Sequence, residues 1–184
     1  RRRHPLAGQD NSRPEARSRE RKHLEPSAAN ADLLIDTTDL TPRALRDMIT
    51  SRLIQQRDGL SLLFESFAFK RGVPTDADFV FDARALPNPY WRDELRSQTG
   101  LATEVIQFLE NDPRCLAFFD KLKDFIADVL RDFDQSDRSY MTIAIGCTGG
   151  QHRSVYLTEK LHRELIAQFP AAQIRHRDLQ EAGS

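Results

Sequence analysis

The sequence predicts an α/β protein with a mainly parallel β-sheet, whose main, three-layer-like domain begins at about Leu60. Two apolar runs, residues 60–69 and 140–145, have the aromatic and β-branched character of strands buried in such a sheet. Apolar residues at helical spacing follow them, over 113–133 and from Ser154 onward. Because buried strands that alternate with helices are typical of parallel sheets, these observations together predict the fold class.

The first 57 residues predict the end of an α/β domain whose beginning is absent. Residues 1–32 are rich in arginine and lack sustained apolar periodicity, which indicates a solvated or partly disordered arm or, alternatively, an arginine segment that faces phosphate. Residues 33–37 predict a short buried strand. Thr41 and Pro42 then provide an N-cap and a first-turn proline for a helix. Its apolar stripe consists of Leu45, Met48, Ile49 and Leu53.

The remaining elements follow from the same patterns. Strands are predicted over 60–69, 79–84 and 140–145, and helices over 104–109, over 113–133 and from Ser154 onward. Two prolines fix the backbone of loop 86–91, whose aromatic residues could line a pocket. The longest helix carries a stripe predicted to be core, made of Leu116, Phe119, Leu122, Ile126, Val129 and Phe133. Cys115 on the same helix is predicted to be packed.

Composition excludes several classes of function. The formal net charge of -1 gives no global field that would draw the protein to nucleic acid or a membrane, so such binding requires a local basic patch. No apolar run is long enough for a membrane span, and the arginine-rich start does not resemble a signal peptide. The sequence therefore predicts a soluble, cytoplasmic protein. The two cysteines lack metal-ligand spacing, so neither structural zinc nor a disulfide framework is expected.

The strongest chemical signal is the glycine-rich segment after the strand at 140–145. A strand that ends in such a turn and enters a helix is an anion site, because the first helical N–H groups lack backbone partners. Gly149 and Gly150 let the backbone approach a ligand, and Arg153 can grip a phosphate through two hydrogen bonds. The smaller donors of the segment are Thr148, His152 and Ser154. The residues thus predict a phosphate site.

Cys147 and Arg153 also have the Cys-x5-Arg spacing of the phosphate loop in cysteine-dependent phosphatases. In that chemistry the helix N-terminus and the arginine lower the pKa of a thiol that attacks phosphorus, and Asp82 is a candidate general acid. The same residues are also compatible with an anion loop without chemistry and with a tight turn around a buried cysteine. Binding without catalysis is favoured, and enzymatic activity stays open.

Two further groups of polar residues are candidates for binding. Asp82, Arg84 and Asn88 follow a predicted strand, where an α/β sheet forms its ligand crevice, and together with the glycine-rich turn they suit a sugar phosphate. They could instead make only local turn contacts. Basic residues flank other predicted element ends, where they could follow a nucleic-acid backbone or could be scattered surface charge. They are Lys70, Arg71, Arg92, Arg96, Arg138, Arg175, His176 and Arg177.

Matching stretches that span nearly the whole chain resemble the RapZ family of RNase adapter proteins and its nucleotide-binding relatives. They are residues 1–6 (Arg-Arg-Arg-His-Pro-Leu), 64–70 (Phe-Glu-Ser-Phe-Ala-Phe-Lys), 76–82 (Asp-Ala-Asp-Phe-Val-Phe-Asp), 86–91 (Leu-Pro-Asn-Pro-Tyr-Trp), 99–101 (Thr-Gly-Leu) and 145–156, which contains Gly-Cys-Thr-Gly-Gly-Gln-His-Arg-Ser. The resemblance implies the C-terminal fragment of a P-loop NTPase domain over residues 1–57, followed by a domain over 58–184 that recognises glucosamine-6-phosphate or a similar sugar phosphate and small regulatory RNA.

The resemblance also implies roles for residues and partners. The sugar-phosphate pocket is expected at Asp82, Arg84, Asn88, Cys147, Thr148, Gly149, Gly150, His152 and Arg153, and an RNA contact is expected at Lys70. Arg71, Arg175 and Arg177 are added as RNA-binding candidates because they are basic residues at predicted element ends. The implied partners are the RNA, an endoribonuclease and further copies of the chain. Full-length relatives resemble ATP- or GTP-binding proteins. This sequence has no G-x-x-x-x-G-K-[ST] motif, so no cofactor is expected to be required. Tyr90 and the lysine-poor tail, residues 178–184, depart from RNA-binding relatives.

Overall fold

The computed structural model describes residues 13–38, 40–49, 60–134 and 140–179, and the chain divides into two compact units between Leu34 and Ile35. In the first unit lies α1 (Arg13–Ala29), whose described side chains are exposed. The sequence predicts a solvated arm here. The side chains are indeed solvated, but the backbone is helical, because glutamate, lysine, arginine and alanine favour helix even without an apolar stripe. The arginines at the start of the chain lie outside the described residues.

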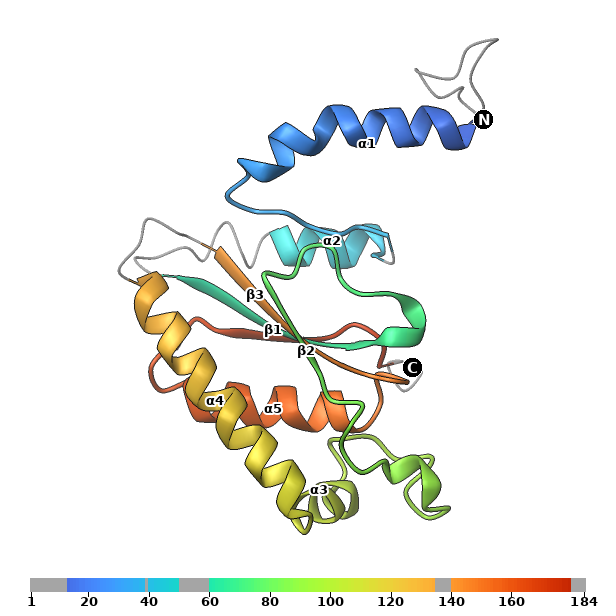
Figure 1. Ribbon diagram of the computed structural model, residues 1–184, viewed down its shortest axis with the longest axis vertical. Helices are drawn as coiled ribbons and strands as arrows, with labels where there is room; N and C mark the ends of the chain where they lie inside the picture. The colour runs from blue at the N-terminus through green and yellow to red at the C-terminus, as the bar shows by residue number, and fades with distance from the viewer. Residues whose placement is uncertain (1–12, 39, 50–59, 135–139, 180–184) are drawn as a thin grey trace. The chain divides into compact units, whose positions relative to one another are not determined.

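The second unit is built on a four-stranded sheet of order β2-β3-β1-β4, in which every strand pair is parallel (Figure 1). This arrangement confirms the predicted α/β class with its parallel sheet. The strands are β1 (Ser61–Ala68), β2 (Phe79–Asp82), β3 (Tyr140–Cys147) and β4 (Gln173–His176). The helices are α2 (Pro42–Ile49), α3 (Thr103–Glu110), α4 (Pro113–Asp134) and α5 (Arg153–Leu165), and two short 3-10 helices are η2 (Phe69–Arg71) and η3 (Pro89–Trp91).

The register of the sheet brings the carboxyl ends of its strands to one edge. Ala68 at the end of β1 pairs with Cys147 at the end of β3. Asp82 at the end of β2 pairs with Gly146, and His176 at the end of β4 pairs with Ser66. Consequently the segments that follow the four strands leave the sheet side by side, at the edge where α/β proteins form ligand sites.

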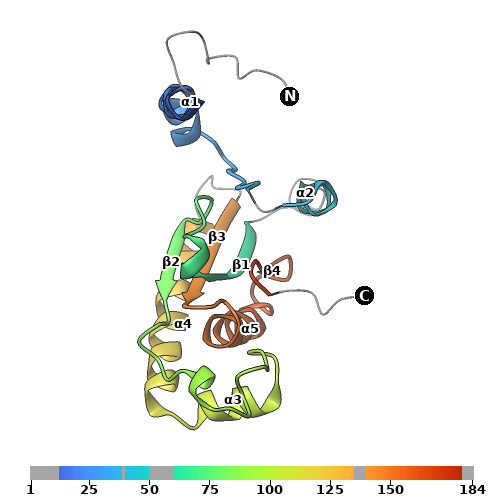
Figure 2. The same ribbon diagram turned by 90° about the vertical axis from the view of Figure 1, so that its right-hand side faces the viewer.

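The hydrophobic core lies between the sheet and the helices α4 and α5, which Figure 2 shows on one side of it. From the sheet it contains Phe64 and Ile143, both fully buried, and Phe79 of β2 packs edge-to-face on Phe125 of α4. The predicted α4 stripe is confirmed at its centre, where Phe119, Leu122 and Ile126 are buried. Leu116 is 40% exposed, so that assignment was wrong: the helix turns Cys115 inward in its place. The prediction that Cys115 is packed is confirmed.

Two elements differ from the sequence-based expectation. Residues 33–37 form neither helix nor strand, and Leu34 is exposed, because the described residues offer this segment no strand to pair with. The strand β4 was not predicted, because Gln173–His176 is too polar to give the apolar pattern of a buried strand. It pairs with β1.

The expected helix start at Thr41 is confirmed: the Thr41 hydroxyl oxygen accepts a hydrogen bond from the Ala44 N–H at 3.1 Å. Leu53 lies outside the described residues.

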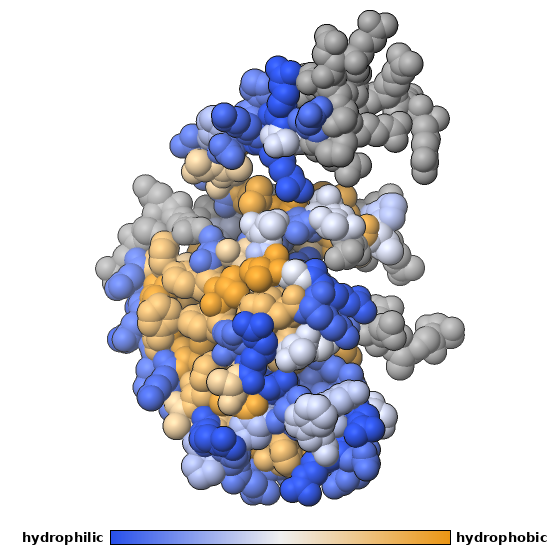
Figure 3. Space-filling model, turned by 45° about the vertical axis from the view of Figure 1, so that its right-hand side comes forward, coloured by the Kyte–Doolittle hydropathy of each residue, from blue (hydrophilic) through white to orange (hydrophobic). Residues whose placement is uncertain are grey.

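Large apolar side chains such as Val80 and Phe125 stay partly exposed, and Figure 3 shows apolar surface on one face of the molecule. Among the described helices, none has the length and apolar character needed to cross a membrane.

Candidate functional site at the glycine-rich turn

The glycine-rich turn lies where the sequence predicts it, between the end of β3 at Cys147 and the start of α5 at Arg153. Gly150 has φ +69°, a left-handed conformation that favours glycine. A Cβ at this position would also lie 3.0 Å from the Cβ of Ala68 in β1. Glycine is therefore required here both by backbone conformation and by the close approach of the neighbouring strand.

Arg153 connects the turn to the loop that follows β2. Its side chain is buried, and one terminal nitrogen donates to the carbonyl oxygens of Arg84 at 2.9 Å and Leu86 at 3.0 Å. The other terminal nitrogen donates to the Thr148 hydroxyl at 3.4 Å. The Nε–H is buried without a hydrogen-bond partner among the described residues. Arg153 thus fixes the glycine-rich turn and the loop after β2 relative to each other with a charge that stays inside the protein.

Gln151 and His152 attach the turn to residues 95–100. The Gln151 amide donates to the carbonyl oxygen of Gln98 at 2.5 Å, and the Gly100 N–H donates to the Gln151 carbonyl at 2.9 Å. Nε2 of His152 donates to the Leu95 carbonyl oxygen at 3.1 Å. Burial, with a contribution from the charge of Arg153, lowers the pKa of His152 below its usual value. His152 is therefore a neutral structural donor.

Cys147 is buried, with its sulfur 3.1 Å from the Ser154 hydroxyl oxygen. Burial, the largest single influence, opposes ionisation of this thiol. The hydrogen bonds from Ser154 and the Gly150 N–H, together with the charge of Arg153, outweigh it and lower the pKa of Cys147. Cys115 shows the opposite behaviour, because burial raises the pKa of its thiol to about 11. The turn therefore favours negative charge at its centre.

Around this buried frame lies a group of accessible polar side chains. Asp82 and Arg84 form a two-pronged ion pair in which Arg84 donates to Asp82 at 2.6 to 3.0 Å, and these hydrogen bonds lower the pKa of Asp82. Thr148 is exposed at the turn, and the Lys70 ammonium nitrogen lies 4.0 Å from the space a Cβ on Gly149 would fill. Asn88 caps η3, where its side-chain oxygen accepts from the Tyr90 N–H at 3.4 Å.

The residues predicted to contact RNA fall into two pairs. Lys70 and Arg71 lie on η2, which has no buried residue, and the Lys70 N–H donates to the Thr148 carbonyl oxygen at 3.4 Å. Arg175 and Arg177 lie at the end of β4 with side chains only 19% and 13% exposed. Arg175 pairs with the buried Glu65, so its charge is engaged inside the protein. Only the first pair lies beside the glycine-rich turn with its side chains accessible.

Sequence reasoning missed several residues that carry charge in this region. Glu65 and Asp76 are buried carboxylates near Arg175, and Asp178 accepts from the Ala68 N–H at 2.5 Å next to the turn. A signal was present for Glu65, because a lone glutamate inside the apolar run 60–69 must be paired when that run is a buried strand. The part of the chain that the structure describes contains no group of three or more metal-ligating side chains placed to hold a metal ion.

Gly100 offers a stringent test of how tightly residues 95–100 are held to the turn. A Cβ there would overlap the His152 carbonyl oxygen and lie 2.5 Å from the Tyr156 nitrogen, and backbone atoms cannot move aside cheaply. We expect Gly100→Ala to lower the free energy of unfolding by about 2 kcal/mol or more in chemical denaturation. Gly149→Ala is the control, because its Cβ would meet nothing closer than 4.0 Å. Equal stability of the two variants would contradict the described packing.

Comparison with known proteins identifies the family. The family model "RapZ C-terminal domain" matches residues 60–180, and "RapZ-like N-terminal domain" matches residues 1–57. Proteins named "Nucleotide-binding protein" are 49% identical in Marinobacter nauticus over 180 residues, 46% in Saccharophagus degradans over 182 and 50% in Pseudomonas putida over 180. These alignments cover 97 to 98% of this chain but only 61 to 63% of the relatives. The chain therefore belongs to the RapZ family.

Proposed function

We propose that this chain is a cytoplasmic ligand-sensing adapter that recognises an amino-sugar phosphate, glucosamine-6-phosphate, at the glycine-rich turn and binds small regulatory RNA beside it. In this role it presents the RNA to an endoribonuclease and works as a homo-oligomer. The observation that carries the proposal is the convergence of three strand ends, at Ala68, Asp82 and Cys147, on one turn that opens a helix. Partners and assembly rest on the family membership.

The accessible groups at this edge suit both ends of such a ligand. The Lys70 ammonium, the Arg84 guanidinium and the Thr148 hydroxyl are donors for phosphate oxygens, and the N-terminus of α5, where His152 makes no side-chain cap, adds partial positive charge. Asp82 is ionised, because hydrogen bonds from Arg84 lower its pKa, and it can accept from the ligand's ammonium or hydroxyl groups. An amino-sugar phosphate carries both kinds of group.

The buried residues of the predicted pocket have a supporting role in this proposal. Cys147, His152 and Arg153 hold the loops that carry the accessible groups, and all three are less than 6% exposed. A ligand would therefore contact Thr148, Gly149 and Arg84 first. Nucleotide binding, which the names of the relatives state for those proteins, is not part of the proposal, since the sequence lacks a G-x-x-x-x-G-K-[ST] motif.

Arg84 is the residue that tests the ligand site best. We expect calorimetric titration with glucosamine-6-phosphate to give a measurable binding heat, and Arg84→Ala to weaken binding by about tenfold or more, because a charge-assisted phosphate contact is lost. Arg114→Ala is a matched control, since Arg114 forms the same kind of pair with the aspartate two residues before it, at the start of α4. If the parent protein gives no binding heat, the sensor proposal is wrong.

The RNA interface is tested through η2. We expect the double variant Lys70→Ala/Arg71→Ala to weaken binding of a structured small RNA in gel-shift titrations, and to reduce the slope of log affinity against log salt by about 2, one for each lost phosphate contact. Lys121→Ala/Arg131→Ala removes two exposed cations from α4 and should leave the slope unchanged. An unchanged slope in the η2 variant would reject this interface while leaving the sugar-phosphate site intact.

A second candidate function, a cysteine-dependent phosphatase, is favoured by the lowered pKa of Cys147. Two observations weigh against it: the Cys147 side chain is only 2% exposed, and Asp82, the candidate general acid, is ionised in its pair with Arg84. If the thiol is the nucleophile, hydrolysis of p-nitrophenyl phosphate must disappear in Cys147→Ser. Hydrolysis that survives this substitution excludes Cys147 as the nucleophile. If the parent chain hydrolyses nothing, the phosphatase candidate is rejected and only the binding function remains.

A further inference from the structure

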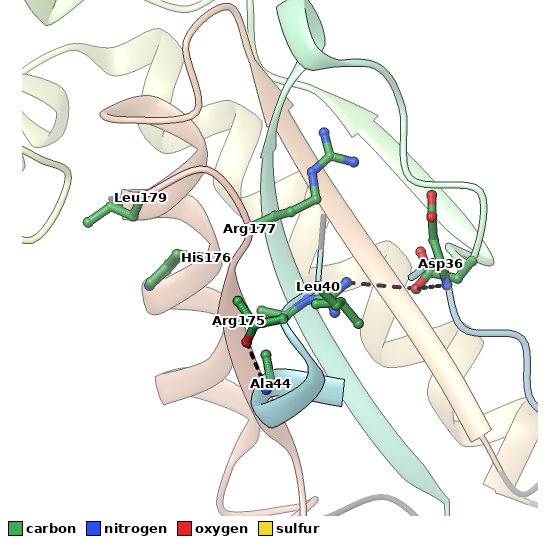
Figure 4. A pocket seen from close by; sticks show the side chains of 9 residues that line it. Asp36, Leu40, Ala44, Arg175, His176, Arg177 and Leu179 are labelled. Atoms are coloured by element: carbon green, nitrogen blue, oxygen red, sulfur yellow. Dashed lines mark hydrogen bonds and ion pairs between the residues drawn. The ribbon is translucent and has the colours of Figure 1, made fainter. Parts of the chain in front are cut away.

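A second concave site lies between the segment that leads into α2 and the end of β4. It has a volume of about 520 Å³, within the range of small-molecule sites. Figure 4 shows Arg175 and Arg177 at the end of β4, Leu40 and Ala44 at the start of α2, and Asp36 across from them. Its lining residues are Asp36, Leu40, Thr41, Ala44, Asp76, Arg175, His176, Arg177 and Leu179.

Arg175 and Asp76, which line the pocket, belong to a charge network that also includes the buried Glu65. Glu65 of β1 is fully buried, and Arg175 donates to it from Nε at 2.6 Å and from a terminal nitrogen. The same guanidinium lies 3.7 Å from Asp76, whose side chain is 2% exposed. Asp76 in turn accepts from the Asp36 N–H at 3.2 Å, and Arg175 reaches the Met48 sulfur of α2 at 3.6 Å. Arg175 is thus a cation shared by two buried carboxylates.

The network has more acceptors than donors. Within the described residues, Oε1 of Glu65 and Oδ1 of Asp76 are buried without a hydrogen-bond partner. The other guanidinium, that of Arg177, donates to Asp178 at 3.4 Å and to the Gly72 carbonyl oxygen. Burial raises the pKa of Glu65, the charge of Arg175 opposes this shift, and the charge of Asp76 adds to it. A buried carboxylate oxygen without a donor is costly, so the network is complementary to one added cation.

His176 does not supply that cation to the network. Its two ring nitrogens contact the Ser66 hydroxyl at 2.8 Å and the Glu159 carboxylate at 3.0 Å, so both are engaged away from Asp76. Asp36 is held by hydrogen bonds from Thr38 and Thr75, and these bonds lower its pKa, so it remains a third carboxylate at the pocket. Two lining carboxyl groups, Asp36 and Asp76, therefore lie at the pocket with the guanidinium groups of Arg175 and Arg177, and Arg175 is already paired with the buried Glu65.

We propose that this pocket binds a small organic ammonium ion, with the cationic nitrogen at Asp76 and a short apolar part against Leu40, Ala44 and Leu179. The ammonium group would donate to Asp76, and the aliphatic lining residues Leu40, Ala44 and Leu179 would contact the apolar part. A metal ion fits less well, because the described residues provide no cluster of three metal-ligating side chains. None of the lining residues belongs to the glycine-rich turn, so the proposal does not depend on the proposed function.

Methyl NMR of the full chain tests this site directly. We expect n-butylammonium chloride to shift the methyl signals of Leu40, Ala44 and Leu179 in a saturable titration, with sodium chloride at equal concentration as the baseline. The neutral isostere 1-butanol should give no saturable shifts, because it carries no charge to pair with Asp76. Equal binding of the two probes, or no shift with either, would overturn the proposal.

Two variants separate the charge from the cavity. Asp76→Asn keeps the shape of the side chain and should weaken n-butylammonium binding by about tenfold, while Asp93→Asn, at an exposed carboxylate, should leave it unchanged. Ala44→Phe fills the space between α2 and β4 and should abolish the methyl shifts of Leu40 and Leu179. Unaltered affinity in Asp76→Asn contradicts the proposal. Should that variant fail to fold, retained binding in Ala44→Phe would contradict it instead.

Discussion

The buried guanidinium of Arg153 is the interaction on which the arrangement of the candidate site depends. It donates to two carbonyl oxygens, those of Arg84 and Leu86, and so fixes the loop after β2 against the turn after β3. A charge buried in this way is stable only while its partners stay in place, since an unpaired buried cation is costly. The positions of Asp82 and Arg84 at the strand edge are therefore coupled to the fold of the turn.

The residues of the glycine-rich segment therefore have two different roles, one in holding the loops together and one in presenting accessible groups. Residues that resemble ligand-binding groups on chemical grounds, such as Arg153 and His152, have their donors turned toward backbone carbonyls. The groups left for a ligand are Thr148, Gly149 and the side chains that Arg153 positions. Because this framework is formed by hydrogen bonds within the protein, the proposed ligand would not need to order these loops.

The sequence predicts the fold well where burial and period agree. The apolar runs 60–69 and 140–145 correspond to β1 and β3, and the spacing in residues 113–133 corresponds to α4. Prediction failed where tertiary context decides: β4 is polar and becomes a strand only through its pairing with β1, and the apolar residues 33–37 have no such partner among the described strands. Within the site, the turn could be located from its glycines, but the direction of the Arg153 side chain could not, because it depends on carbonyls 67 and 69 residues away.

The same strand, β1, carries two different electrostatic environments. At its carboxyl end, Ala68 adjoins a turn whose N–H groups and arginine favour an anion. Three residues earlier, the buried Glu65 pairs with Arg175, which lines the second pocket together with Asp76. Arg175 and Arg177 lie on the β4 side of that second region, where internal carboxylates already hold them. The distribution of buried partners, more than the number of basic residues, therefore determines which edge of this sheet is free to meet a phosphate.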